Sequence, residues 1–315
     1  MADDPRQGSK RDYIQTLDAL TKQVYALEDE AVKRAMRLLQ DALAEINSRV
    51  ITADGWRLEN LQNLQRQVDD IMRNFMAQYG AEFASIQSQA WAIGVDSVDQ
   101  PLKVSGLFLN PARLNPSIVA VLQGFSADLI RNITDQTRTT INATIAQSML
   151  GRLSPFDAQK RLTQIIGAHD RLRDLTGISA RAEAQFRTEV GRVYSIATQA
   201  RQEQIAETAP DIRKAWAHKG SGLQPRSGHL AAHGQTVRVD EFFLVSPKFG
   251  KPAEELMYPR DPRGSAENTI NCGCRSVTWR EGYGDVLPRT TARVDALKQR
   301  AGIEARDRRY WMVGL

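Results

Sequence analysis

Proline is absent from a long stretch near the start of the chain, between Pro5 and Pro101. Because proline interrupts helices, its absence there permits helices of many turns. Apolar residues recur in this stretch every three or four positions, which is typical of one face of an amphipathic helix. The pattern predicts a helix over residues 12 to about 50, a break at 52–55, and a second helix over 61–93. We expect an antiparallel helical hairpin over residues 1–100.

The next part of the chain, residues 101–210, is predicted to be a second helical domain. Three prolines lie within residues 95–116, which indicates a loop. Apolar spacing predicts helices over 117–150, 155–165 and 179–207. Ser154 and Pro155 form a typical helix start, with serine as the N-cap and proline in the first turn.

The character of the chain changes after Pro210. Seven of the 12 prolines lie between Pro210 and Pro288, and 11 of the 21 glycines follow residue 210. Short apolar or alternating segments predict strands over 212–218, 236–239 and 242–245. Residues 269–272 and 276–279 are predicted to form either one bent strand or two. We therefore expect a small, turn-rich α+β module over 211–288, followed over 289–315 by a C-terminal tail that begins with a helix at about 290–305. The whole chain is predicted to be an α+β protein.

Composition excludes several classes of protein. Two cysteines in 315 residues cannot form the framework of a disulfide-rich secreted domain. The longest apolar runs are too short for a membrane-spanning helix, and the polar N-terminus does not resemble a secretory signal. The net charge is +5, and residues 211–315 carry 18 basic and 12 acidic side chains. A basic last third is compatible with contact to nucleic acid but does not require it.

Four residues of the module form a candidate metal site: His229, His233, Cys272 and Cys274. On a helical turn, residues four apart lie on one face, which would bring the two histidines together. The two cysteines are one residue apart, so in an extended segment their sulfurs lie on one side. Two thiolates and two imidazoles form a set of ligands that suits tetrahedral zinc. Such a zinc would be structural, because a turn-rich unit of this size has a thin core.

Other interpretations of the same residues remain open. The cysteines can be two buried apolar thiols, whereas a disulfide between them would close a very small ring. A catalytic zinc would keep one position open for water, with Glu267 or Asp240 as the base. A Cys–His nucleophile pair is a further alternative, although no third residue that would orient the histidine is identifiable.

Several segments resemble, in the same order, the motifs of phage minor head proteins of the Mu F-like class. They are 187–189 (R-T-E in a helix), 215–216 (A-W in a strand), 226–234 (R-S-G-H-L-A-A-H-G), 240–243 (D-E-F-F), 258–262 (Y-P-R-D-P) and 267–274 (E-N-T-I-N-C-G-C). The resemblance covers about residues 180–280. The chain departs from the family pattern at Gly273, where arginine is usual, and at 221–223, where an acidic residue is often found.

The resemblance implies a structural role and no enzymatic activity. Proteins of this class are minor components of tailed-phage heads, present in few copies and connected with head assembly or DNA delivery. We therefore expect a virion protein, assembled in the host cytoplasm, that contacts the portal protein, the major capsid protein or packaged DNA and does not contact a membrane. The alternatives are a metal-dependent hydrolase or toxin-like effector that uses the His/Cys cluster, and a DNA-binding protein. The oligomeric state is left open.

Overall fold

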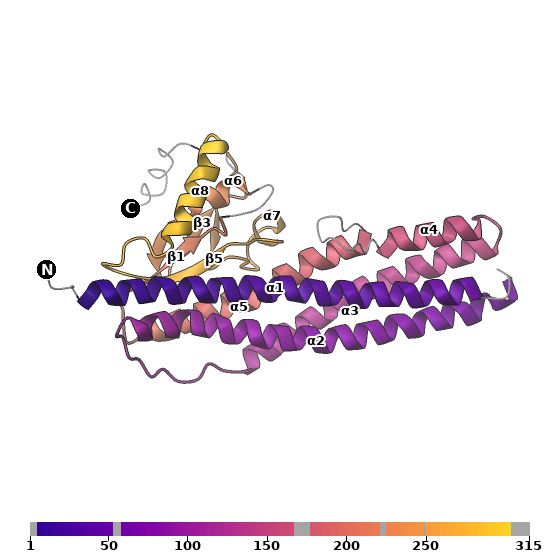
Figure 1. Ribbon diagram of the computed structural model, residues 1–315, viewed down its shortest axis with the longest axis horizontal. Helices are drawn as coiled ribbons and strands as arrows, with labels where there is room; N and C mark the ends of the chain where they lie inside the picture. Colours follow the sequence, from indigo (N-terminus) through magenta and orange to yellow (C-terminus); the bar gives the residue numbers. More distant parts are fainter. Residues whose placement is uncertain (1–4, 53–57, 167–176, 221–224, 249, 304–315) are drawn as a thin grey trace. The chain divides into compact units, whose positions relative to one another are not determined.

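The computed structural model of the protein describes residues 5–52, 58–166, 177–220, 225–248 and 250–303. Long helices are followed by a region of short strands and small helices (Figure 1), which confirms the predicted α+β class. The helices are α1 (Pro5–Thr52), the 3-10 turn η1 (Leu58–Asn60), α2 (Leu61–Val104), α3 (Ser117–Met149), α4 (Pro155–Ile166), α5 (Gly177–Ala206), α6 (Ser227–Ala232), α7 (Ala266–Thr269) and α8 (Pro288–Arg300). The strands are β1 (Ile212–Ala217), β2 (Thr236–Arg238), β3 (Phe243–Val245), β4 (Glu254–Leu256) and β5 (Arg275–Arg280).

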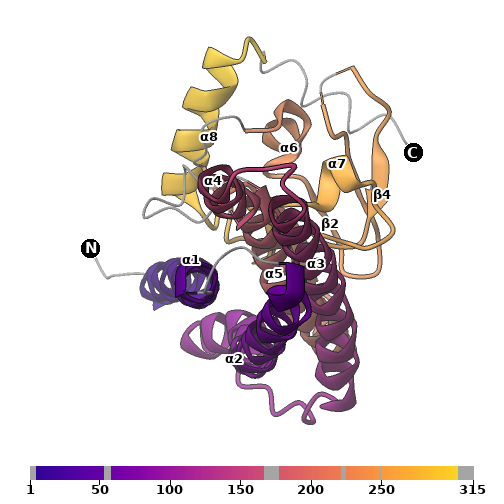
Figure 2. The same cartoon turned by 90° about the vertical axis from the view of Figure 1, so that its right-hand side faces the viewer.

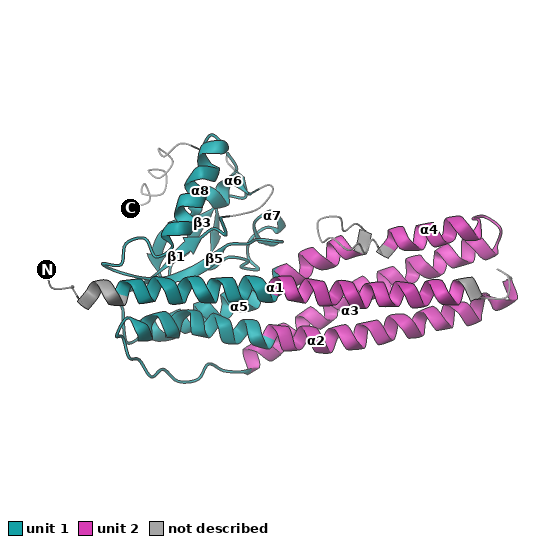
Figure 3. Cartoon of the chain, viewed as in Figure 1, with its two compact units in different colours: residues 1–27, 88–116, 188–315 teal, residues 28–87, 117–187 magenta. Residues whose placement is uncertain are grey.

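The chain divides into two compact units, which are not consecutive in the sequence (Figure 3). Unit 1 contains residues 1–27, 88–116 and 188–315, and unit 2 contains residues 28–87 and 117–187. This differs from the predicted linear division at 100, 210 and 288, because α1, α2 and α5 each run through both units. No helix of the described residues is both long and apolar enough to span a membrane. The predicted tail after residue 303 and most of the predicted break at 52–55 lie outside the described residues.

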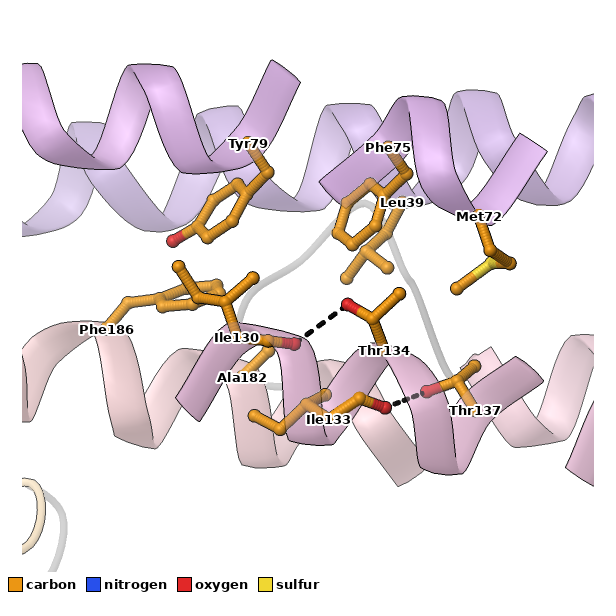
Figure 4. Close-up of a pocket in the computed structure, with 10 residues that line it drawn as sticks. All are labelled: Leu39, Met72, Phe75, Tyr79, Ile130, Ile133, Thr134, Thr137, Ala182 and Phe186. Atoms are coloured by element: carbon orange, nitrogen blue, oxygen red, sulfur yellow. Dashed lines mark hydrogen bonds between the residues drawn. The ribbon is translucent and has the colours of Figure 1, made fainter. Parts of the chain in front are cut away.

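Unit 2 is a bundle of helices with an aromatic core. Phe186 of α5 packs against Tyr79 and Phe83 of α2, with ring centroids 4.4 and 5.4 Å apart. A small cavity of about 10 Å³ lies beside these rings (Figure 4). The hydroxyls of Thr134 and Thr137 donate to the carbonyls four residues earlier in α3. These hydroxyls are thus satisfied within their own helix, which lets a threonine-rich face lie in an apolar core.

Unit 1 contains a three-stranded antiparallel sheet in the order β2-β1-β5. Successive residues of a strand point to opposite faces, so β1 contributes to two cores. Ala215 and Ala217 pack in a core with residues of α1, α2 and α5, among them Tyr13 and Val98. Trp216, from the other face of β1, packs with Phe243, Val245, Leu256, Cys272 and Cys274. The cysteines therefore lie in the second core of the sheet.

Helix α6 lies between α8 and the two-stranded β3–β4 sheet (Figure 2). Leu230 of α6 packs on Val294 of α8, and both are fully buried. Gly228, on another side of α6, meets the backbone of Ser246 directly after β3. These two contacts fix both the position and the rotation of this short helix.

Three details of the predicted elements were wrong. Helix α2 continues to Val104, whereas residues from 95 onward were predicted to be a loop. Val98 and Leu102 are buried and extend the apolar stripe, while Pro101 lies in the last turn and removes a single backbone donor. The predicted strand over 269–272 is instead the end of α7 and a turn. Strand β4 was not predicted, because its three residues carry two glutamates and no recognisable alternation.

Replacing Gly94 with alanine is expected to destabilise the chain by about 2 kcal/mol, in the range for overpacked cores. A Cβ atom at this position would lie 2.6 Å from the carbonyl oxygen of Tyr194 and 2.7 Å from Cβ of Ala197, where α2 crosses α5. Gly80 of the same helix is the matched control, because nothing lies within 4 Å of its Cβ position. Gly80→Ala should raise the free energy of unfolding in urea by about 0.5–1 kcal/mol. Equal effects of the two substitutions would contradict the close helix contact.

Candidate metal centre

His229 reaches the site from α6. Gly228 allows this helix to approach closely, since a Cβ there would lie 1.9 Å from the carbonyl oxygen of Ser246. Arg226, just before the helix, donates to the carbonyl of Ile270 at 2.6 Å and ties α6 to the segment that carries the cysteines. His229 is consequently only 2% exposed.

The cysteines lie on a tight turn between α7 and β5. Asn271 adopts a left-handed conformation with φ of 52°, which asparagine tolerates better than most residues. Its backbone N–H donates to the hydroxyl of Thr188 in α5 at 2.7 Å. Tyr25 of α1 donates to the carbonyl of Gly273 at 2.8 Å. Two long helices thus hold the turn from either side of Cys272.

The side chains of His229, Cys272 and Cys274 converge on one point. Nδ1 of His229 lies 3.5 Å from Sγ of Cys272 and 3.4 Å from Sγ of Cys274. All three ligand atoms lie within 4.8 Å of one another, and all three residues are buried. In a tetrahedral zinc site with ordinary Zn–S and Zn–N bonds, the nitrogen and sulfur ligands are roughly 3.6 Å apart. The two nitrogen–sulfur distances are close to this value, so the group could hold a metal ion.

Hydrogen bonds orient the histidine as a metal ligand. Nδ2 of Asn268 donates to the carbonyl of Val245 at 3.2 Å, so Oδ1 of Asn268 is the acceptor that faces Nε2 of His229 at 2.9 Å. The Nε2 atom must then carry the proton of the neutral ring, which leaves the lone pair of Nδ1 directed at the thiols. Such an outer hydrogen bond to a ligating histidine is a regular feature of metal sites.

The two thiols differ in acidity. The hydrogen bond from Cys274, together with the nearby His229 and Arg260, holds the pKa of Cys272 well below its usual range. Burial raises the pKa of Cys274, and the charged partner Cys272 raises it further. The indole Nε1 of Trp216 is buried with no standard hydrogen-bond partner in the described part of the chain, and its proximity lowers the pKa of Cys274. Because thiolates are the form that binds a metal, an ion at this group would displace any proton that the two thiols carry.

His233 was predicted as a ligand, and the structure does not bring it into this group. Helix α6 ends at Ala232, and His233 is an extended C-cap residue with ψ of 125°. The rule that residues four apart share a helix face therefore does not apply. Its Nδ1 accepts from the backbone N–H of His218 at 3.0 Å, and its Nε2 lies 3.0 Å from the hydroxyl of Thr291.

The two residues considered as catalytic bases lie at the surface in ion pairs. Glu267 pairs with Lys251, and Asp240 pairs with Arg238. Neither joins the group of metal-ligating side chains among the described residues.

Sequence reasoning missed three buried cations in the module: Lys214, Arg260 and Arg275. All are at most 1% exposed. The guanidinium of Arg275 stacks on Tyr25 and Tyr194, with Cζ 4.3 and 5.0 Å from the ring centroids. Arg260 fits against α5 only because residue 191 is glycine, where a Cβ would lie 2.0 Å from the guanidinium carbon. The two rings and this glycine are far from the arginines in sequence, so no local pattern indicates the burial.

Lys214 should make the stability of the chain depend on pH in the alkaline range. Burial lowers its pKa to about 8, from 10.5 in an unfolded chain. Between these values the unfolded chain binds more protons, so the free energy of unfolding should rise with pH, by about 3 kcal/mol in total. Urea unfolding of the wild type and of Lys214→Met, at neutral pH and at roughly pH 10, measures the effect. The difference between the two proteins should change with pH, and a constant difference would contradict the assignment to Lys214.

Comparisons with known proteins give little further information. The uncharacterized protein YqbB of Bacillus subtilis (strain 168) is 31% identical over 88 residues, which are 28% of this chain and 28% of that protein. The chain thus matches about a quarter of the length of this relative. No family model matches the chain. No solved structure matches it either.

Proposed function

We propose that the chain is a minor structural protein of a tailed-phage head, whose C-terminal module is held together by a zinc ion. The observation that carries this proposal is the meeting of separate motif residues in one core. Trp216, Phe243 and the Cys272–Cys274 pair come from three motifs of the Mu F-like resemblance and pack together. His229, from another of these motifs, contacts both cysteines. Residues of separate motifs therefore contribute to one hydrophobic core and to the candidate metal site within it.

Zinc is the metal that suits the donor set. One imidazole and two thiolates are borderline-soft to soft ligands, which favour zinc over magnesium or calcium. The ion would join α6 to the turn before β5. In a small module with short strands, a structural zinc supplies folding free energy on the order of 10 kcal/mol. The metal is proposed as a structural ion that stabilises the module, with no catalytic role.

The helical part supplies surfaces for assembly. Val121 and Phe125, four residues apart on α3, are 72% and 52% exposed. Exposed apolar side chains on one helix face are suited to contact another protein. We propose the portal protein or the major capsid protein as that partner, inside the head. Packaged DNA is a further proposed contact, through the basic last third of the chain.

The function can be tested in the phage or prophage that encodes the chain. Mass spectrometry of purified heads should detect the protein at a few copies per particle. Deletion of its gene should give particles with defective assembly or DNA delivery. A gene copy encoding Cys272→Ser should fail to restore infectious particles, whereas the matched His233→Ala copy should restore them. Absence of the protein from purified heads would overturn the proposal.

DNA contact is tested separately with the purified full chain. If the chain neutralises phosphates, its affinity for duplex DNA should fall steeply as salt is raised, because bound counterions are released. Affinity that does not change with salt would remove DNA from the proposed partners and leave the protein partners in place.

A further inference from the structure

The candidate metal site offers three protein ligands, whereas tetrahedral zinc takes four. Among the described residues, His229, Cys272 and Cys274 form the group of metal-ligating side chains, and no fourth histidine, cysteine or carboxylate joins it. The identity of the fourth ligand therefore decides whether the site is closed or can bind a further molecule.

The two other histidines of the module are in tautomers that cannot complete the site. Nδ1 of His218 accepts from the backbone N–H of Gly220 at 2.9 Å, and Nδ1 of His233 accepts from the backbone N–H of His218 at 3.0 Å. A nitrogen that accepts a hydrogen bond has used its lone pair, and in a neutral ring the other nitrogen carries the proton. Burial lowers the pKa of His218 to about 4, so its ring is neutral near pH 7. Neither ring has a lone pair available for a metal.

The carboxylates around the site already take part in hydrogen bonds or ion pairs. The carboxylate of Glu254 lies near His229, and its Oε2 accepts from the backbone N–H of Ser265 at 2.8 Å. Asp240 and Glu267 lie in the surface ion pairs described above. None of these groups is placed to approach the thiols.

We propose that the metal bound by His229, Cys272 and Cys274 keeps a fourth coordination position that takes a small monodentate ligand. Water fills the position when no other ligand is present. The inference rests on the metal binding proposed above and adds a second property to it. Structural zinc sites are usually closed by four protein ligands, and sites that act on small molecules keep a position open. The structural metal ion would thus also bind a small ligand.

Charged groups of both signs lie near this position. Arg260 lowers the pKa of both thiols, whereas the carboxylates of Glu254 and Glu189 lie near His229 and Arg260. The charge of the small ligand is therefore left open, and a small anion serves as its probe.

The test uses the full chain loaded with Co²⁺, which replaces zinc and reports its ligands by visible absorption. Addition of azide should change the spectrum in a saturable and reversible way, while one cobalt per chain is retained. X-ray absorption of the zinc form should show two sulfur ligands and one imidazole. Two results together would overturn the open position. Azide would leave the spectrum of the chain with one bound cobalt unchanged, and X-ray absorption of the zinc form would show two imidazole ligands.

Variants separate this inference from the metal proposal itself. His233→Ala and His218→Ala should each keep one cobalt and the azide response, whereas His229→Ala should lose cobalt. If His233→Ala instead creates an azide response that the wild type lacks, His233 is the fourth ligand and the inference is wrong while the metal proposal stands. If the wild type binds neither cobalt nor zinc, both are wrong.

Discussion

Replacing Cys272 with serine is expected to abolish the proposed zinc binding and to remove most of the stability that the metal would give to unit 1. A ligand that binds the folded chain alone stabilises it by about 4 kcal/mol when its free concentration is a thousandfold above Kd. Cys272 supplies one of the three ligand atoms that could hold a metal ion among the described residues. Serine keeps the size of the side chain but provides a much poorer ligand.

The measurement pairs zinc content with urea unfolding. The wild type should bind one zinc per chain and Cys272→Ser none, and the wild type should unfold at higher urea. A chelator should make the free energies of unfolding of the two proteins similar, because the metal accounts for most of the difference in stability. His233→Ala is the matched control, since it removes a histidine of the same module that lies outside the group. Loss of zinc from this control, or an equal stability gap with and without chelator, would contradict the three-residue site.

Replacing Gly228 with alanine is expected to destabilise unit 1 by about 3 kcal/mol, at the upper end for overpacking. The new Cβ would lie 1.9 Å from the carbonyl oxygen and 2.6 Å from the carbonyl carbon of Ser246. These are backbone atoms, so a change of rotamer cannot remove the overlap. Helix α6 must move, and His229, the next residue, must move with it. Zinc affinity should therefore fall together with stability.

Gly124→Ala on α3 is the control, because nothing lies within 4 Å of its Cβ position. This substitution should raise stability by about 0.5–1 kcal/mol and leave zinc affinity unchanged. Competition titration with a chromophoric chelator measures the affinity, and urea unfolding measures the stability. A Gly228→Ala chain that binds zinc as tightly as the wild type would show that the position of α6 is not critical for the site.

Local pattern was sufficient to predict most helices and every strand of the described residues except β4. The spacing of apolar residues predicted α1, α3 and α5, and Ser154 caps α4 as expected, with its hydroxyl accepting from the backbone N–H of Asp157 at 3.0 Å. These elements depend on neighbours three or four residues away, which a sequence displays directly.

The site was predictable only in part. The spacing of Cys272 and Cys274 predicted that they would act together, and the four-residue spacing of the two histidines led to His229. His233 lies outside the group for a local reason, because α6 stops one residue before it. The burial of Lys214 and Arg260 was not predicted, for a different reason. A charged residue is ordinarily assigned to the surface, and their burial depends on partners such as Gln199 and Gly191 that lie far away in the sequence.

The two interleaved units have a consequence for how such a protein can change during evolution. Recombination exchanges contiguous gene segments, and domains encoded by one segment are easily transferred. A segment that encodes residues 188–315 would carry both cysteines but would leave behind Tyr25, which holds the Cys272–Cys274 turn from α1. The same transfer would leave Tyr13, which donates to the carbonyl of Thr278 in β5 at 2.6 Å. The module that carries the candidate metal site is therefore expected to be inherited together with the helices that support it.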